Sequence, residues 1–133
     1  MMKEKMKDRL SAIIIKSKKL LLVTGYAESF YWTPGGKVDE KEDHEEALKR
    51  ELYEELNIYL VKLKKYLEYE TLNEITNKKQ KIYCYLVKFN GEIKPKGEIT
   101  KCIWCSRKEI KEINASKGVF NYLLPKLIKD NLI

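Results

Sequence analysis

Three glutamates in one short stretch of the 133-residue chain have the types and spacing to bind a cation. Glu54 and Glu55 follow Glu51 by three and four positions, so on a helix the three side chains occupy a sector of about 100° on one face. Their basic neighbours, Lys49 and Arg50, cannot neutralise three clustered carboxylates. A divalent cation is the natural partner, and ligands that are all oxygen, without Cys or His, favour Mg²⁺ or Mn²⁺ over zinc.

The same glutamates have an alternative explanation, a solvated helix with ion pairs such as Glu46 with Arg50 and Arg50 with Glu54. Ion pairing does not account for the like charges that remain clustered on this face, whereas metal coordination does. Gly35 and Gly36 favour the metal interpretation as well, because glycine lets the backbone approach a metal or a phosphate closely.

A helix anchored on a sheet has to position these carboxylates. Asp43 followed three residues later by Glu46 is a capping-box pattern that predicts where this helix begins. Its apolar residues recur at helical spacing, at Ala47, Leu48, Leu52 and Leu56. This stripe predicts a helix that packs on a sheet and leaves its acidic face at a cleft.

The first half of the chain otherwise predicts strands. The apolar runs Leu10–Ile15 and Leu20–Thr24 flank a polar turn and indicate a hairpin. The stretch Tyr31–Gly36 predicts a short strand that ends in a tight turn at its glycines. Two longer segments, Ile58–Tyr69 and Lys81–Phe89, predict an antiparallel pair. The polar turn Asn73–Gln80 separates the two long strands.

The last third of the chain predicts a loop, a strand and two helices. Asn90–Lys101 is a loop with at most a short edge strand, and Cys102–Ser106 is a strand. A short helix begins near Ser106. A longer helix from about Ser116 to Asp130 is expected to be kinked or divided at Pro125.

Composition excludes several classes of protein. The longest apolar run, Ile82–Val87, is too short to cross a bilayer, and Met1–Arg9 does not resemble a secretory signal, so we expect a cytoplasmic protein. The three cysteines are expected to be reduced. A zinc site at Cys102 and Cys105 is disfavoured, because side chains three apart on a strand point to opposite faces. The net charge of +7 comes mostly from scattered lysines, so we do not expect dedicated nucleic-acid binding.

One sequence pattern joins these residues at fixed spacing. The pattern is G-x5-E-x7-R-E-U-x-E-E-x-G-U, where U is aliphatic, and eight of its nine defined positions match, at Gly36, Glu42, Arg50, Glu51, Leu52, Glu54, Glu55 and Ile58. The chain therefore resembles the Nudix hydrolases, and its length is similar to that of the short MutT-like members. The departure is Asn57 in place of the last Gly. Asn tolerates the left-handed conformation expected there after a helix.

The resemblance implies a fold and a metal site. The fold is an α/β/α sandwich with a mixed β-sheet between helices, formed as one domain by residues 1–133. The Gly35 carbonyl with Glu54 and Glu55 would hold the metal, Glu51 would be a ligand or the base that orients water, and Arg50 would brace the glutamates. The family typically uses a further carboxylate beyond this box, as a ligand or as the base. Glu98 is our prediction for it, and Glu92 is the alternative.

The resemblance also implies a reaction, the Mg²⁺-dependent hydrolysis of the diphosphate bond of a nucleoside diphosphate linked to another group. A nucleoside triphosphate giving a monophosphate and pyrophosphate is the favoured substrate; ADP-ribose, nucleotide sugars and dinucleoside polyphosphates remain alternatives, as does a non-catalytic nucleotide sensor. Nothing distinguishes a monomer from a homodimer. The residues predicted to bind substrate are Tyr31, Trp32, Gly36, Lys37 and Asn114.

Overall fold

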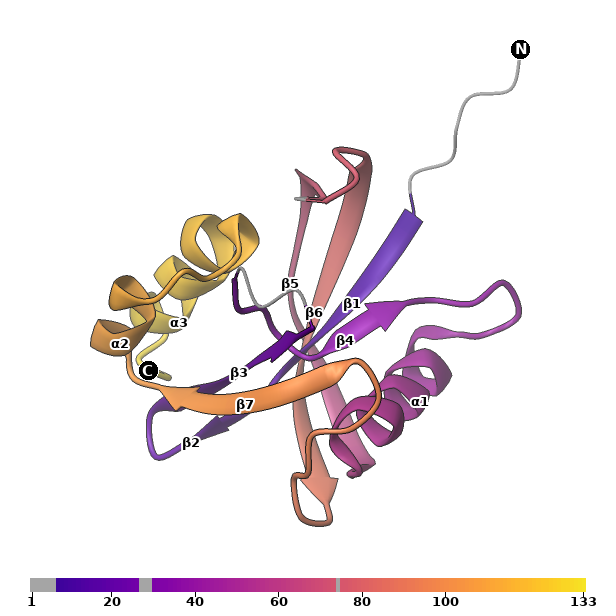
Figure 1. Ribbon diagram of the computed structural model, residues 1–133. Helices are drawn as coiled ribbons and strands as arrows, with labels where there is room; N and C mark the ends of the chain where they lie inside the picture. The colour runs from indigo at the N-terminus through magenta and orange to yellow at the C-terminus, as the bar shows by residue number, and fades with distance from the viewer. Residues whose placement is uncertain (1–6, 27–29, 74) are drawn as a thin grey trace.

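The computed structural model describes residues 7–26, 30–73 and 75–133, in which two β-sheets lie between helices (Figure 1). The larger sheet has the order β4-β1-β6-β5, from strands Gly35–Lys37 (β4), Lys7–Ile13 (β1), Lys79–Asn90 (β6) and Tyr59–Leu72 (β5). β1 runs parallel to β6, and the other pairs are antiparallel. The smaller, antiparallel sheet has the order β2-β3-β7, from Ile15–Lys16, Lys19–Gly25 and Ile99–Cys105. The expected mixed α/β/α sandwich is confirmed.

Helices cover both sides of these sheets. The helix α1 (His44–Leu56) lies on one side, and α2 (Arg107–Glu112), a π-helical turn η1 (Val119–Leu123) and α3 (Leu124–Lys129) lie on the other (Figure 1). In the described part of the chain, no helix is both long and apolar enough to cross a membrane. Most of Met1–Arg9, the segment expected to carry no secretory signal, lies outside the described residues.

The core consists of two apolar clusters, one beneath each helical layer. Leu21 and Val23 of β3 pack in the cluster that contains the leucines of α1, whereas Leu20 and Leu22 pack in the cluster beneath α3. All four side chains have no exposed surface. Because successive side chains of a strand point to opposite faces, a strand covered on both faces needs a continuous apolar run. The run that begins at Leu20 therefore fixes β3 in the middle of the molecule.

The predicted hairpin is correct only at its turn. The short strand β2 pairs with β3, but β1 belongs to the other sheet, where it lies between β4 and β6. The prediction of one strand through Leu10–Ile15 was wrong because the chain passes from one sheet to the other at Ile14. This residue is buried, and its carbonyl accepts a hydrogen bond of 2.9 Å from the Leu21 amide.

The glycines also differ from the sequence prediction, because they lie in strand β4 and not in a tight turn. Gly35 has φ +140°, and a Cβ atom there would lie 2.0 Å from the carbonyl oxygen of Leu10 on β1. Glycine is required at this position because the two backbones approach too closely for any side chain. The close approach of two backbones, and not a reversal of the chain, explains why glycine stands at this position.

The limits of α1 follow its predicted caps. The Asp43 side chain accepts a hydrogen bond of 2.8 Å from the Glu46 amide. Asn57 ends the helix in the left-handed conformation, with φ 60° and ψ 31°, as predicted. Its amide donates to the carbonyls of the last helical turn, which satisfies groups that would otherwise lack a partner.

The remaining elements lie close to their predicted positions. The antiparallel pair β5 and β6 is confirmed, each strand a few residues longer than expected. β7 begins at Ile99, three residues before its predicted start, and Cys102 and Cys105 on it face opposite clusters. The C-terminal helix is divided as predicted, with Pro125 in the first turn of α3. The division takes the form of the π-helical turn η1, which the sequence did not predict.

Candidate active site

Three of the glutamates of α1, Glu51, Glu54 and Glu55, lie at one cleft but differ in exposure. Glu55 is buried, whereas the side chain of Glu51 is 16% exposed and that of Glu54 is 56% exposed. The buried face of α1, with Leu48, Leu52 and Leu56, packs in the core and holds the helix in place. The three carboxylates therefore project from an anchored helix, and their exposure increases from Glu55 through Glu51 to Glu54.

Burial dominates the electrostatics of the two inner carboxyl groups. The Gly35 amide of β4 donates a hydrogen bond of 2.9 Å to Oε1 of Glu55. Burial nevertheless raises the pKa of Glu55 to about 8, with a smaller contribution from the charges of Glu51 and Glu98. Burial also raises the pKa of Glu51, against the lowering effect of Arg50. A raised pKa means that these carboxyl groups keep their protons to higher pH than a free glutamate, unless a cation compensates their charge.

Arg50 connects the acidic residues on the outer side of α1. Its guanidinium donates to Glu42 at 2.7 and 2.8 Å, to Glu51 at 2.9 Å and to Glu54 at 3.3 Å. It also donates to the carbonyl oxygen of Lys37 at 3.2 Å. The role in bracing the glutamates that was predicted for Arg50 is thus reflected in its contacts.

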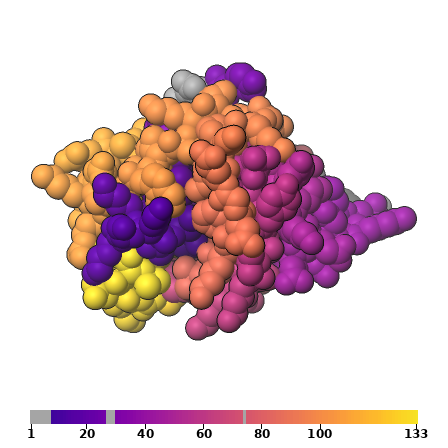
Figure 2. Space-filling model, turned by 90° about the horizontal axis from the view of Figure 1, so that it is seen from below, coloured from indigo at the N-terminus to yellow at the C-terminus, as the bar shows by residue number. Residues whose placement is uncertain are grey.

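The loop after β6 brings Glu98 to the same cleft, which has a volume of about 470 Å³ and is lined by Glu51, Glu54, Glu55, Lys96, Gly97 and Glu98. The Lys96 amide donates to the Glu55 carbonyl at 2.9 Å, and the Lys94 amide donates to the Leu56 carbonyl at 2.9 Å. Figure 2 shows this segment directly beside the helix. The alternative carboxylate, Glu92, does not line the cleft; it lies 3.9 Å from the ammonium of Lys94.

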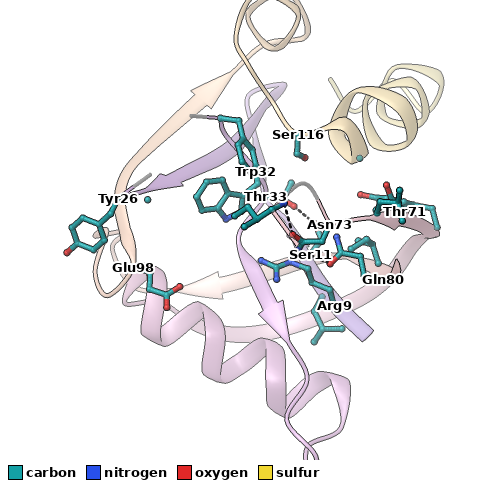
Figure 3. A pocket seen from close by; sticks show the side chains of 18 residues that line it. Arg9, Ser11, Tyr26, Trp32, Thr33, Thr71, Asn73, Gln80, Glu98 and Ser116 are labelled. Atoms are coloured by element: carbon teal, nitrogen blue, oxygen red, sulfur yellow. Dashed lines mark hydrogen bonds between the residues drawn. The ribbon is translucent and has the colours of Figure 1, made fainter. Parts of the chain in front are cut away.

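A second cavity, also of about 470 Å³, adjoins the acidic cleft (Figure 3). Its lining comes from both sheets and their loops and includes Arg9, Ser11, Trp32, Tyr69, Gln80 and Glu98. Trp32 is in contact with Phe30, at a ring centroid distance of 5.3 Å. Glu98 lines both cavities, so they meet at this residue. An apolar, aromatic compartment therefore borders an acidic one at Glu98.

Comparison with known proteins places this geometry in a family. A sequence model of the NUDIX domain matches residues 6–124 of the chain. The chain belongs to the Nudix family. The comparison with curated proteins found no match. Membership makes the protein a Nudix hydrolase, an enzyme of a family that generally uses divalent metals and acts on nucleotide-derived substrates.

Solved structures show the same fold. The solution structure of the E. coli ORF135 protein is 26% identical, with a TM-score of 0.80 over 96% of this chain and 91% of that one. The crystal structure of MutT NUDIX hydrolase from Burkholderia pseudomallei is 24% identical, with a TM-score of 0.71 over 80% of this chain and 87% of that one. A MutT structure from a study of Aliivibrio salmonicida and Vibrio cholerae is 19% identical, with a TM-score of 0.78 over 95% of this chain and 99% of that one.

The donor set of this Nudix site suits a hard divalent cation, because the carboxylates supply oxygen ligands beside a backbone that approaches closely at Gly35. Among the described residues, however, no group of three or more His, Cys, Asp or Glu side chains is arranged so that it could hold a metal ion. Glu51 and Glu54 are turned toward Arg50 instead. Coordination would therefore require these two flexible side chains to turn toward Glu55.

The residues predicted to bind substrate are not all at the cavities. Trp32 lines the aromatic cavity, but within the described residues the lining of this cavity does not include Tyr31, Gly36, Lys37 or Asn114. Tyr31 and Trp32 are neighbours in an extended segment, so their side chains point to opposite sides, and Tyr31 packs against the core. Asn114 is exposed, and its carbonyl accepts a hydrogen bond of 2.8 Å from the Tyr31 amide.

Gly36 and Lys37 instead contribute to the metal side of the site. A Cβ atom on Gly36 would lie 2.6 Å from the carboxyl group of Glu51, so this glycine leaves the space that Glu51 occupies. The side chain of Lys37 is exposed, and its backbone carbonyl accepts from Arg50.

Sequence reasoning missed the polar residues of β1 and β6 that line the aromatic cavity, Arg9, Ser11 and Gln80. The available signal was the alternation of Arg9 and Ser11 with the buried Leu10 and Ala12, which places the polar pair on the other face of β1. Without the order of the strands, that face could not be assigned to a cavity.

Proposed function

We propose that this Nudix hydrolase cleaves nucleoside triphosphates to nucleoside monophosphates and pyrophosphate in the presence of Mg²⁺. The observation that carries this proposal is the meeting of two unlike cavities at Glu98. A nucleotide has an uncharged aromatic end and a polyphosphate end, and the two compartments match this division. The MutT structures named above share the fold, which is consistent with the proposal.

In this proposal Glu51, Glu54, Glu55 and Glu98, with the carbonyl of Gly35, hold the metal. Mg²⁺, or Mn²⁺, would offset the charge of the phosphates and lower the pKa of a bound water. Because burial raises the pKa of Glu55 to about 8, this group must lose a proton when it becomes a ligand. Metal affinity should therefore increase with pH through the neutral range.

The protein groups also orient the reaction. Glu51 and Glu98 are the candidates for the base that accepts a proton from the attacking water, because both line the acidic cleft and neither is tied to the backbone of β4. Arg50 donates to Glu51 at 2.9 Å and to Glu54 at 3.3 Å, and both side chains would turn from it toward Glu55 when they become ligands. Trp32 offers an aromatic surface for the base.

The test is a substrate panel with variants of the site. Nucleoside triphosphates, ADP-ribose, nucleotide sugars and dinucleoside polyphosphates are compared by phosphate release after coupling to a phosphatase. We expect a triphosphate to give the highest kcat/KM and both Glu54→Gln and Glu55→Gln to reduce it by at least about 100-fold. Glu45→Gln, on an exposed position of the same helix, is the matched control and should retain activity.

Each other result has a distinct meaning. Preference for another compound of the panel would retain the metal site but replace the proposed substrate. Nucleotide binding without turnover would favour a sensor. Full activity in both Glu54→Gln and Glu55→Gln would refute the assigned metal ligands.

A further inference from the structure

Among the described residues that line the aromatic cavity, Arg9 is the one cationic group. Arg9 and Glu98 are the charged residues among the described lining, which otherwise consists of aromatic, aliphatic, hydroxyl and amide side chains with two glycines. Arg9 is half-buried in these surroundings, where a guanidinium gains more from an anionic partner than it would on the open surface. The cavity therefore contains a group that is suited to an anionic ligand atom.

The position of Arg9 is fixed by the sheet. It lies on β1, an inner strand, where it pairs with Lys37 of β4 on one side and with Ile82 of β6 on the other. Arg9 and Ser11 lie on the same face of the strand, and Figure 3 shows both side chains at the cavity. An inner strand is a rigid support, so it holds the Cα atom of Arg9 in one place, as a recognition site requires.

Arg9 also lacks the protein partners that occupy Arg50. Within the described ranges no hydrogen bond or ion pair involves the Arg9 side chain, whereas Arg50 donates to three glutamates and a carbonyl. Arg50 is therefore a structural arginine, whereas the five N–H donors of Arg9 remain available to a ligand. Arg9 is half-buried and lines the cavity, so these donors are within reach of a ligand there.

The charge of Arg9 reaches the acidic cleft as well. Its coulombic effect lowers the pKa of both Glu51 and Glu55, although burial outweighs it in each case. Arg9 is therefore close to the boundary between the aromatic cavity, which it lines, and the carboxylates of α1. In the proposed substrate, the phosphate attached to the nucleoside is the group that crosses this boundary.

We propose that Arg9 binds the phosphate that joins the nucleoside to the rest of the substrate. The proposal rests on the function proposed above. The planar guanidinium can donate two parallel hydrogen bonds to two oxygens of one phosphate, a geometry that lysine does not offer. Arg9 would act in binding and orientation, and would also hold the monophosphate product after cleavage.

The test measures product affinity in wild type, Arg9→Gln and Arg9→Lys. Binding of the nucleoside monophosphates that correspond to the triphosphates of the panel, of their parent nucleosides and of pyrophosphate is measured by calorimetry with saturating Mg²⁺, beside KM and kcat. Arg107→Gln, an exposed arginine at the start of α2, is the matched control. Thermal unfolding checks that each variant is folded.

We expect Arg9→Gln to weaken monophosphate binding by about 10- to 100-fold and to raise KM, with affinities for pyrophosphate and nucleoside within about threefold of wild type. The affinity of Arg9→Lys for the monophosphate should lie between the affinities of wild type and Arg9→Gln. Unchanged monophosphate affinity, or no measurable binding by wild type, would overturn the proposal. An equal loss of nucleoside affinity would overturn it too, since Arg9 would then contact the base or sugar.

The two proposals fail in different ways. If wild type cleaves no compound of the panel, the proposed function fails, yet the calorimetric comparison of monophosphate binding still tests Arg9. If wild type cleaves a triphosphate while Arg9→Gln binds the product normally, the function stands and the role of Arg9 is wrong.

Discussion

Replacement of Glu55 by Gln should abolish activity but stabilise the metal-free protein at high pH. Glutamine has nearly the same shape and can accept the hydrogen bond from the Gly35 amide, which is 2.9 Å from Oε1 of Glu55. It has no proton to lose. In wild type, by contrast, raising the pH forces a buried carboxyl group to ionise.

The size of the effect follows from the pKa of Glu55, which burial raises from 4.5 to about 8. Between these values the folded protein holds a proton that the unfolded chain has released, so the free energy of unfolding falls as the pH rises. The separation of 3.5, at about 1.4 kcal/mol per pH unit, sets an upper bound of about 5 kcal/mol. Relaxation at the open cleft reduces this, and we expect about 2 kcal/mol.

The measurement is urea unfolding in EDTA at pH 5, 7 and 9, followed by tryptophan fluorescence. The difference in unfolding free energy between Glu55→Gln and wild type should grow between pH 5 and about 8 and then remain constant. Glu54→Gln, at an exposed position of the same helix, should show no such growth. Mg²⁺ should reduce the difference by stabilising wild type at pH 9. Parallel pH curves for wild type and Glu55→Gln would refute the reasoning.

Two further predictions concern backbone positions of the site. Gly36→Ala should reduce kcat/KM by at least about 10-fold while changing the unfolding free energy by less than about 1 kcal/mol, because the new Cβ displaces the flexible carboxyl group of Glu51, 2.6 Å away. Equal losses of stability and activity, measured by urea unfolding and turnover, would contradict this. Asn57→Ala should cost about 1 kcal/mol in urea unfolding, because alanine is strained at φ 60°, and Asn57→Gly should not. A neutral Asn57→Ala would show that the cap is not strained.

The acidic helix was predictable because its signals are local. The cap at Asp43, the leucine stripe and the left-handed Asn57 each depend on residues within a few positions, and the structure has all three. The family resemblance was the basis for predicting Glu98 at the site, and Glu98 lines the cleft. The hydrogen bond from the Lys96 amide to the end of α1 explains how its loop is held there. Local chemistry and motif spacing were sufficient for this half of the site.

The other half depends on which strands become neighbours, and no local signal gives that. The chain changes sheets at Ile14 without a glycine, a proline or a polar residue there, so the sequence suggested one continuous strand. The breakers at Gly35 suggested a turn, although they serve the close approach to Leu10. Arg9 was missed for the same reason, since its place in the cavity depends on β1 lying between β4 and β6.

The attachment of the Glu98 loop to the final carbonyls of α1 couples two parts of the site that are distant in the chain. The amides of Lys94 and Lys96 replace the hydrogen bonds that a longer helix would have supplied to Leu56 and Glu55. Pulling this loop away would uncover those carbonyls and fray the turn that carries Glu55. The two hydrogen bonds therefore tether the segment before Glu98 to the helix end beside Glu55, which limits how far these two carboxylates can separate.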